Sequence, residues 1–295
     1  MVSMPQVPNR TSVMISPAKN IDQATVDGFG REWKTFTQST ADFASDDRQA
    51  IFDGYFSNFP WTRLSLQSIG ADIGCGSGRW AMLVAPRVGH LHVVDAAAEA
   101  IDIARSNLGC IDNVSFHHTS VSALPFDDGA LDFAYSIGVL HHIPDTQHAI
   151  CDIAAKLKPG APFLIYLYYA FDNRSAVYRA LWKSSNVVRQ ILSRAPYPAQ
   201  IAATTVIAVM VYWPLARLAA LLERLGLLPR SWPLGFYRRY SFYVMRTDAF
   251  DRFCTRLEQR FSRVQITDML RAAGLDDIRF SEQEPFWVAV AIKQR

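Results

Sequence analysis

The chain has 295 residues, of which 50% are hydrophobic and 19% are charged. This composition provides enough apolar side chains for a sizeable core, and it excludes a disordered or collagen-like chain. The four cysteines are scattered without a CxxC pair, which argues against a zinc ribbon and a disulfide-stapled scaffold. The first thirty residues contain no apolar run of signal-peptide length, so we expect a cytoplasmic protein.

Positive charge is concentrated in one segment. The formal net charge of the chain is +3, but residues 173–246 contain eleven lysines or arginines and one acid, Glu223. Their balance is +10, and that of the remainder is −7. We interpret the basic segment as an insertion into an acidic body, with a boundary near Ala170.

The first predicted element is a helix between residues 25 and 36, where Phe29, Trp33 and Phe36 recur at helical spacing. Short apolar runs then alternate with helix-like stretches from Ser68 to Tyr169, as in a parallel sheet flanked by helices. The predicted strands are Ile69–Ile73, Leu91–Val94, Val114–Phe116, Leu131–Ile137 and Phe163–Tyr168. The predicted helices are Arg79–Ala85, Ala97–Asn107 and Thr146–Leu157. A doubly wound α/β sheet of this kind binds ligands at the carboxyl ends of its strands.

A glycine-rich turn follows the first predicted strand, in the sequence ADIGCGSGR from Ala71 to Arg79. A dinucleotide-binding loop reads G-x-G-x-x-G, whereas the third glycine here comes one residue early. This difference favours a smaller nucleoside ligand over a dinucleotide. Glycines also occur in ordinary tight strand-to-helix turns that bind no ligand. A suitably spaced acid is therefore needed to distinguish a nucleoside-binding loop from such a turn.

Asp95 is that acid, because it closes the second predicted strand 21 residues beyond Gly74. A carboxylate about 20 residues past such a loop hydrogen-bonds ribose hydroxyls. The alternative is that Asp95 only caps the next helix. Loop and acid together predict adenosine binding.

Four motifs in this order resemble the class I S-adenosylmethionine-dependent methyltransferases, in the branch that acts on small molecules and quinone-like lipids. The motifs are DIGCGSG, VVD, LPFDDGALDFAYSIGVLHHIPD and LKPGAPFLIY, followed near the C-terminus by ITDMLRAAGLDDIRF. The resemblance implies a doubly wound, seven-stranded, mainly parallel sheet with a helical cap insertion, and S-adenosylmethionine as the cofactor. It implies four regions: an N-terminal helical lid (1–64), the cofactor-binding α/β core (65–170), a basic, apolar helical insertion (171–260), and a C-terminal helix and strands that complete the sheet (261–295).

The resemblance also implies which residues bind the cofactor. The glycine loop would line its methionine and ribose portions, Asp95 would hold the ribose hydroxyls, and the residues before LPF would flank the adenine. The family usually has an acid where Ser120 stands, so the backbone amide of Val121 is expected to take over part of that role. The predicted cofactor-binding residues are Trp33, Asp72, Gly74, Cys75, Gly76, Gly78, Asp95, Ala96, Ser120, Val121, Ser136 and Ile137.

A similar F-G-x-E-W segment often opens related methyltransferases and folds over the donor. Phe29, Arg31 and Trp33 are therefore predicted lid residues. The alternative is a helix that simply packs on the body.

The catalytic candidates are His141, His142 and Tyr168, which follow the fourth and fifth predicted strands. Motif order places both histidines where the donor methyl should project, so one of them is a candidate general base. The alternative is that both cap the strand end and orient the next loop. We expect His141 to lie nearer the donor, because it leaves the strand first. No spacing among the seven histidines matches a metal-ligand set, so no metal is predicted.

The insertion contains an uncharged run over residues 195–216, flanked by Arg194 and Arg217. Its length would allow a transmembrane helix, but its three prolines and its polar residues leave a strongly apolar part of only about fourteen residues. Three arrangements stay open: a spanning helix, a helix that lies on a membrane surface, and a cap buried on the body.

The sequence predicts methyl transfer to a hydrophobic, lipid-like or anionic small molecule. Basic and aromatic side chains over residues 174–246 suit peripheral membrane contact as well as such an acceptor. Nucleic acid is not an expected partner, because the basic segment is built around apolar residues. The alternatives are a membrane-associated lipid or quinone methyltransferase, and a protein of this fold that binds the nucleoside without transferring methyl.

Overall fold

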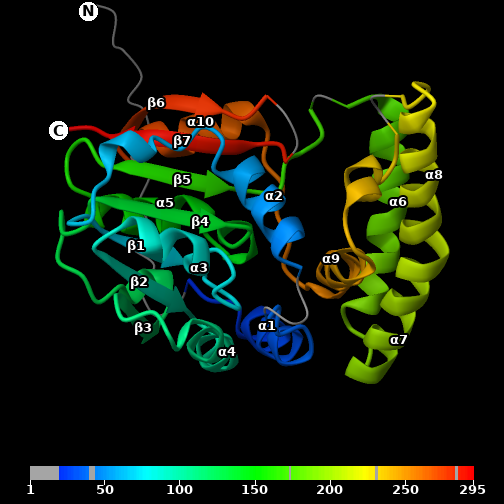
Figure 1. The fold of residues 1–295 in the computed structure, drawn as a ribbon, viewed down its shortest axis with the longest axis horizontal. Helices are drawn as coiled ribbons and strands as arrows, with labels where there is room; N and C mark the ends of the chain where they lie inside the picture. Colours follow the sequence, from blue (N-terminus) through cyan, green and yellow to red (C-terminus); the bar gives the residue numbers. More distant parts are fainter. Residues whose placement is uncertain (1–19, 40–43, 173, 230–231, 283–284) are drawn as a thin grey trace, which may run out of the picture.

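A seven-stranded sheet forms the body of the protein in the computed structural model, which describes residues 20–39, 44–172, 174–229, 232–282 and 285–295 (Figure 1). The strand order is β3-β2-β1-β4-β5-β7-β6. The strands are β1 (Ile69–Ile73), β2 (His90–Asp95), β3 (Val114–His118), β4 (Phe133–Ile137), β5 (Pro162–Tyr166), β6 (Leu275–Phe280) and β7 (Val288–Lys293).

The first five strands are parallel, and β7 runs antiparallel to both β5 and β6. The doubly wound, seven-stranded, mainly parallel sheet predicted from the sequence is confirmed. Ile73 pairs with Val94, and Ile137 pairs with Tyr166, so four strands end along one edge. The loops that follow β1, β2, β4 and β5 therefore meet there.

Helices cover both faces of the sheet and bury two apolar clusters against it. One face carries α2 (Ser45–Tyr55), α3 (Ala81–Val84) and α4 (Ala98–Leu108). The other carries α5 (Thr146–Lys156) and α10 (Arg263–Ala272). The start of α5 is set by Asp145, whose carboxylate accepts a hydrogen bond from the amide of His148.

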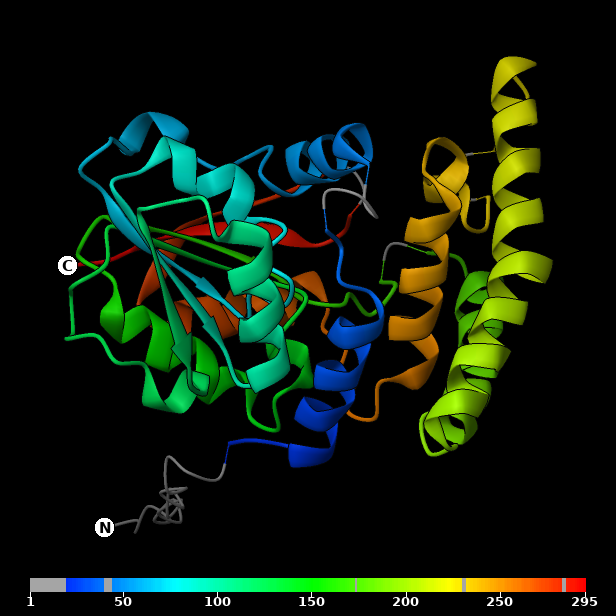
Figure 2. The same cartoon turned by 60° about the horizontal axis from the view of Figure 1, so that its bottom comes forward.

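The N-terminal helix α1 (Gln23–Thr35) packs against α4 and lies between the sheet and the insertion (Figure 2). Phe36 ends the helix and is buried, with its ring 5.5 Å from that of Phe250. This helix therefore joins the sheet body to the insertion.

The insertion is a helical layer beside the sheet (Figures 1 and 2). Its main helices are α6 (Ala176–Leu192), α7 (Tyr197–Ile207), α8 (Trp213–Arg224) and α9 (Phe242–Cys254). Helix α9 faces the body, whereas α7 and α8 are outermost (Figure 2).

One 28-residue helix, Tyr197–Arg224, comprises α7, α8 and the π-helical turn Ala208–Tyr212 between them. We name it the long helix. Its prolines do not shorten it: Pro198 lies in the first turn, where no hydrogen bond is lost, and Pro214 lies at the start of α8, two residues after the end of the π-helical turn. Among the described residues, this is the one helix long and apolar enough to cross a membrane by length and composition.

The long helix is only partly buried. On one side the helix packs against Met245 and Ala249 of α9 through Ala208, Tyr212 and Ala216. Over its most apolar 18 residues, however, only 22% is buried. The prediction of a buried cap therefore describes one side of this helix and not the other.

Candidate active site

A cavity of about 730 Å³ lies between the carboxyl ends of the strands and the insertion. Its walls come from α1, from the loops after β1, β2, β4 and β5, and from the helices of the insertion. This is the place where a doubly wound sheet binds its ligands.

The glycine loop forms the wall next to β1. Gly74 and Gly76 have φ of +79° and +54°, which favours glycine at both positions. A Cβ on Gly74 would lie 2.4 Å from the Val139 side chain, and one on Gly76 would lie 2.6 Å from the Trp33 ring. The backbone can thus reach the cavity only because both side chains are absent.

Asp95 fixes this loop. Its Oδ2 accepts a hydrogen bond from the Gly76 amide at 2.9 Å, and its Oδ1 accepts one from the Ala97 amide at 2.9 Å. Burial raises the pKa of Asp95, and these backbone hydrogen bonds oppose that rise. The Ala96 amide adds a third backbone hydrogen bond, and a carboxylate has about four lone-pair sites, so one remains for a ligand in the cavity. The capping role and the ligand-binding role proposed for Asp95 are therefore compatible.

Most of the residues predicted to bind the cofactor lie on the cavity wall. They are Trp33, Gly74, Cys75, Gly76, Asp95, Ala96, Ser120, Val121 and Ile137.

Three predicted cofactor-binding residues are not on the wall. Asp72 is buried inside β1, and this burial raises its pKa to about 8. Gly78 packs against Leu108 of α4, because the turn points it away from the cavity. Ser136 donates its hydroxyl proton to the Ile73 carbonyl at 2.9 Å. In this structure these three residues lie behind the cavity wall, at the ends of β1 and β4 and in the turn after β1.

The predicted lid is only partly present. Trp33 lies over the glycine loop, and Phe29 lines the cavity with its ring 5.0 Å from that of His142. Arg31 instead points outward from α1, where its guanidinium lies 5.9 Å from the Tyr197 ring. The prediction of Arg31 as a lid residue was wrong, because the helix turns it away from the cavity.

Of the two histidines, His142 lines the cavity, whereas His141 is fully buried behind the wall. The ring of His141 stacks on Tyr168 with centroids 3.9 Å apart. This reverses the expectation that His141 lies nearer the donor, because the short helical turn at Leu140–His142 rotates the first histidine inward.

The hydrogen bond made by His142 defines its tautomer. Nδ1 lies 2.6 Å from the Leu257 carbonyl oxygen, which can only accept, so Nδ1 carries the proton. Nε2 then bears a lone pair, and it has no hydrogen-bond partner among the described residues. Burial lowers the pKa of His142, so the ring is neutral at pH 7.

Three carboxyl groups on the wall were not predicted from the sequence: that of buried Glu32 and those of partly buried Asp248 and Asp251. Burial raises the pKa of Glu32 well above its usual value, with Asp251 adding to the rise, and raises that of Asp248 to about 6. The Tyr168 hydroxyl donates a hydrogen bond to Asp251, so this tyrosine holds its proton and positions the carboxylate. The sequence signal for Asp248 and Asp251 was weak. These two acids lie one helical turn apart and directly follow residues 173–246, which contain a single acid, Glu223.

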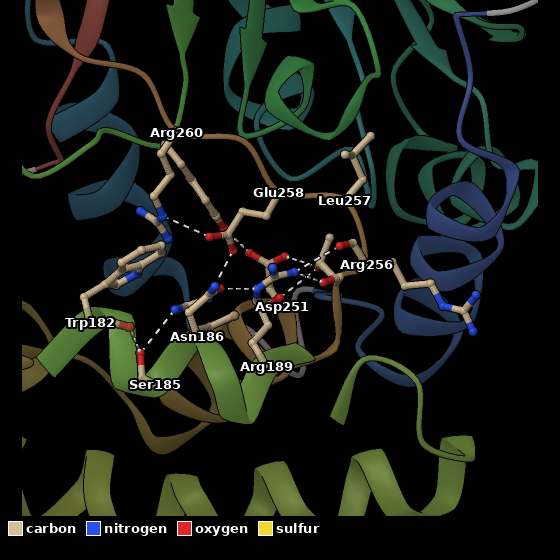
Figure 3. Close-up of polar contacts among 12 residues, drawn as sticks. Trp182, Ser185, Asn186, Arg189, Asp251, Arg256, Leu257, Glu258 and Arg260 are labelled. Carbon is tan, nitrogen blue, oxygen red and sulfur yellow. Dashed lines mark hydrogen bonds and ion pairs between the residues drawn. The ribbon is translucent and has the colours of Figure 1, made fainter. Parts of the chain in front are cut away.

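A polar network fixes the loop that follows α9 (Figure 3). Glu258 accepts hydrogen bonds from Arg252 at 3.3 Å and from Arg260 at 2.9 Å. Arg189 of α6 donates to the carbonyls of Thr255 and Arg256, at 2.8 and 3.0 Å. Because Leu257 lies within this loop, the network holds its carbonyl in place against His142.

The far end of the cavity is apolar. Its wall there includes Ile207, Val211 and Leu215 of the long helix, together with Trp232 and Leu234. The cavity wall is therefore apolar along the long helix, and it is polar at the strand ends and beside α9. Among the described residues, no group of three or more His, Cys, Asp or Glu side chains is placed to hold a metal ion.

Residues 71–160 match the protein family described as "Methyltransferase domain". This segment contains the glycine loop, Asp95 and the two histidines. The chain carries a class I S-adenosylmethionine-dependent methyltransferase domain, as the sequence resemblance predicted, and S-adenosylmethionine is the cofactor of this family.

Curated relatives match about a third of the chain. "Uncharacterized methyltransferase YcgJ" of Bacillus subtilis is 33% identical over 101 residues, which are 34% of this chain and 40% of that protein. "Phosphoethanolamine N-methyltransferase 2" of Caenorhabditis elegans is 34% identical over 100 residues, which are 33% and 23% of the two chains. The chain thus spans less than half the length of these relatives. A solved structure, geranyl diphosphate C-methyltransferase from Streptomyces coelicolor, aligns with a TM-score of 0.40 and 15% identity over 46% of this chain and 50% of its own.

Proposed function

We propose that this protein transfers a methyl group from S-adenosylmethionine to a hydrophobic or lipid-like small molecule. One observation carries the proposal: a single cavity joins the glycine loop and Asp95 to an apolar wall built by the insertion. We place the protein in the cytoplasm, in peripheral contact with a membrane through residues 174–246.

The residues at the strand ends fit the cofactor. The glycine loop offers backbone within reach of a ligand, Asp95 keeps a lone pair for a ribose hydroxyl, and Ser120 and Val121 line the wall beside them. When bound, S-adenosylmethionine supplies a methyl group on a positively charged sulfur. Trp33 closes the glycine loop on the solvent side.

The acceptor would lie between the strand ends and the long helix. Holding two reactants at near-attack distance can provide roughly 7–11 kcal/mol of the barrier, so the shape of the wall carries most of the catalysis. Nε2 of His142 would accept the proton that a hydroxyl or amine acceptor loses.

The test is an acceptor screen with S-adenosylmethionine labelled in its methyl group, run with and without detergent-solubilised lipid extract. Label recovered in an organic-soluble product is the expected result, and heat-denatured protein is the control. Calorimetric binding of S-adenosylhomocysteine without any labelled product would favour the alternative, a protein of this fold that binds the nucleoside without transferring methyl.

Asp95→Asn is expected to weaken S-adenosylhomocysteine binding by about 5- to 150-fold, which corresponds to the roughly 1–3 kcal/mol cost of leaving buried polar partners unpaired. The amide keeps one acceptor oxygen, but its NH₂ group faces an amide that needs an acceptor. Titration calorimetry measures the affinity. Asp102→Asn, on the next helix and outside the cavity, is the matched control. Unchanged affinity in Asp95→Asn would contradict a ribose-binding role.

A further inference from the structure

Exposed apolar side chains gather on the long helix and its neighbours. Of the 16 large hydrophobic residues exposed in the described part of the chain, 12 lie between residues 187 and 227. Val206, Val209, Met210 and Trp213 recur at helical spacing and are each 46–69% exposed, and Leu221 continues the row at 52%. We name these five residues the outer stripe. Monomeric soluble proteins rarely expose contiguous apolar surface of this kind without a partner.

The opposite side of the same helix is packed. Ala208, Tyr212 and Ala216 are buried against α9, and the Thr204 hydroxyl donates to the Gln200 carbonyl on that side. A helix held in this way cannot be surrounded by lipid without losing its contacts with the domain. The outer stripe can therefore meet a membrane surface, whereas the helix does not span one.

Charge on the long helix complements an anionic surface. Exposed Arg217 and Arg224 follow the outer stripe on the same side of the helix. The single acid of the segment, Glu223, is already paired with Arg238 and Arg239 at 3.0 and 2.7 Å. Apolar and aromatic residues flanked by arginine are typical of a helix that lies in the interface of a bilayer with anionic lipids.

The inner side of the long helix lines the cavity through Ile207, Val211 and Leu215. One helix thus has a bare apolar side and a side that faces the proposed acceptor. We propose that the outer stripe docks on the surface of an anionic bilayer, and that the lipid-like acceptor enters the cavity from that bilayer beside the long helix. The entry step rests on the proposed methyl transfer, whereas the docking step does not.

Sedimentation with vesicles tests the docking. The protein is expected to bind phosphatidylglycerol-containing vesicles better than pure phosphatidylcholine vesicles, and to be released as salt rises, because surface charge is screened within about 8–10 Å at physiological ionic strength. Val209→Glu with Met210→Glu should lower partitioning at least about tenfold. Val264→Glu places one glutamate on a residue that is 68% exposed on α10, away from the outer stripe, and it should change nothing.

A second vesicle-binding experiment removes positive charge from the long helix. Arg217→Gln with Arg224→Gln should weaken binding to anionic vesicles by about thirtyfold, since each basic residue near such a surface contributes about 1 kcal/mol. Arg271→Gln on α10 is the control. Indifference of the wild type to both vesicle types would overturn the proposal. So would a dimer that forms without lipid and dissociates in Val209→Glu/Met210→Glu, because a second copy would then cover the outer stripe.

Entry of the acceptor from the bilayer is tested separately, by the incorporation of label from the donor into lipid. With labelled donor and vesicles made from lipid extract, Val209→Glu/Met210→Glu should incorporate far less label than the wild type, yet match it when the same extract is dissolved in detergent. If the variant incorporates equally little label with vesicles and with the detergent-dissolved extract, entry of the acceptor from the bilayer is overturned. Failure of the proposed function is distinguishable, because the wild type would then transfer no label in detergent either, while vesicle binding would persist.

Discussion

Gly76→Val is expected to abolish detectable binding of S-adenosylmethionine and of S-adenosylhomocysteine, and with it methyl transfer. The residue has φ of +54°, and its Cβ would lie 2.6 Å from the ring of Trp33. Valine adds two methyl groups beyond that Cβ and is strained at positive φ. The loop must therefore move, which also breaks the hydrogen bond from the Gly76 amide to Asp95. Calorimetry measures the affinity.

Two variants separate this local effect from general destabilisation. Gly226→Val has the same backbone penalty, with φ of +69°, but a Cβ there meets nothing within 4 Å. It should lose stability while keeping its affinity for S-adenosylhomocysteine. Trp33→Ala in the Gly76→Val background removes the collision and should raise the unfolding temperature above that of the single variant. Gly76→Val that binds the nucleoside within about threefold of the wild type would contradict the assigned site.

The sheet and the part of the cavity at its strand ends could be predicted because their signals are local. Gly74, Gly76 and Asp95 occur within one strand-turn-helix unit and the strand after it, so their spacing along the chain determines their spacing in the structure. Parallel strands also place the ends of β4 and β5 beside them. The positions of Ile137 and Tyr168 on the cavity wall follow from that pairing.

Side-chain direction could not be predicted in the same way. His141 and His142 are adjacent, and which of them faces the cavity depends on the short helical turn after β4. Asp72 and Gly78 belong to the recognised motif, but they serve the packing of the loop. A motif therefore indicates where a ligand binds more reliably than which of its members contact the ligand.

The acceptor end depends on contacts between distant parts of the chain. Glu32 comes from α1, and Asp248 and Asp251 come from α9, more than 200 residues later. No motif links them, and only the packing of α1 between the sheet and the insertion places them on one wall. The full length of the long helix likewise could not be predicted, because a π-helical turn accommodates Pro214 without ending the helix.

Substitution of His142 is expected to have the second large effect, on the rate of the chemical step. If its Nε2 accepts the acceptor's proton, His142→Asn is expected to lower the rate of the chemical step by about 10²–10⁴-fold. The affinity for S-adenosylhomocysteine should stay nearly unchanged, because the lost interaction belongs to the transition state. Asparagine can still donate to the Leu257 carbonyl, so the loop keeps a partner there. His148→Asn, on the exposed side of α5, is the matched control.

The pH dependence separates a base from a structural residue. Because burial lowers the pKa of His142, the neutral ring that can accept a proton persists to lower pH than for an exposed histidine. The single-turnover rate of the wild type should therefore rise with pH, with its midpoint below the 6.5 of an unperturbed imidazole. In His142→Asn the part of this rise that belongs to His142 should vanish, whereas the titration of Asp248, whose pKa is about 6, contributes equally in both proteins. If the variant instead keeps a rate within about threefold of the wild type and the same pH profile, alignment of the reactants alone carries the reaction. His142 would then serve to hold Leu257, Phe29 and the cavity wall in place.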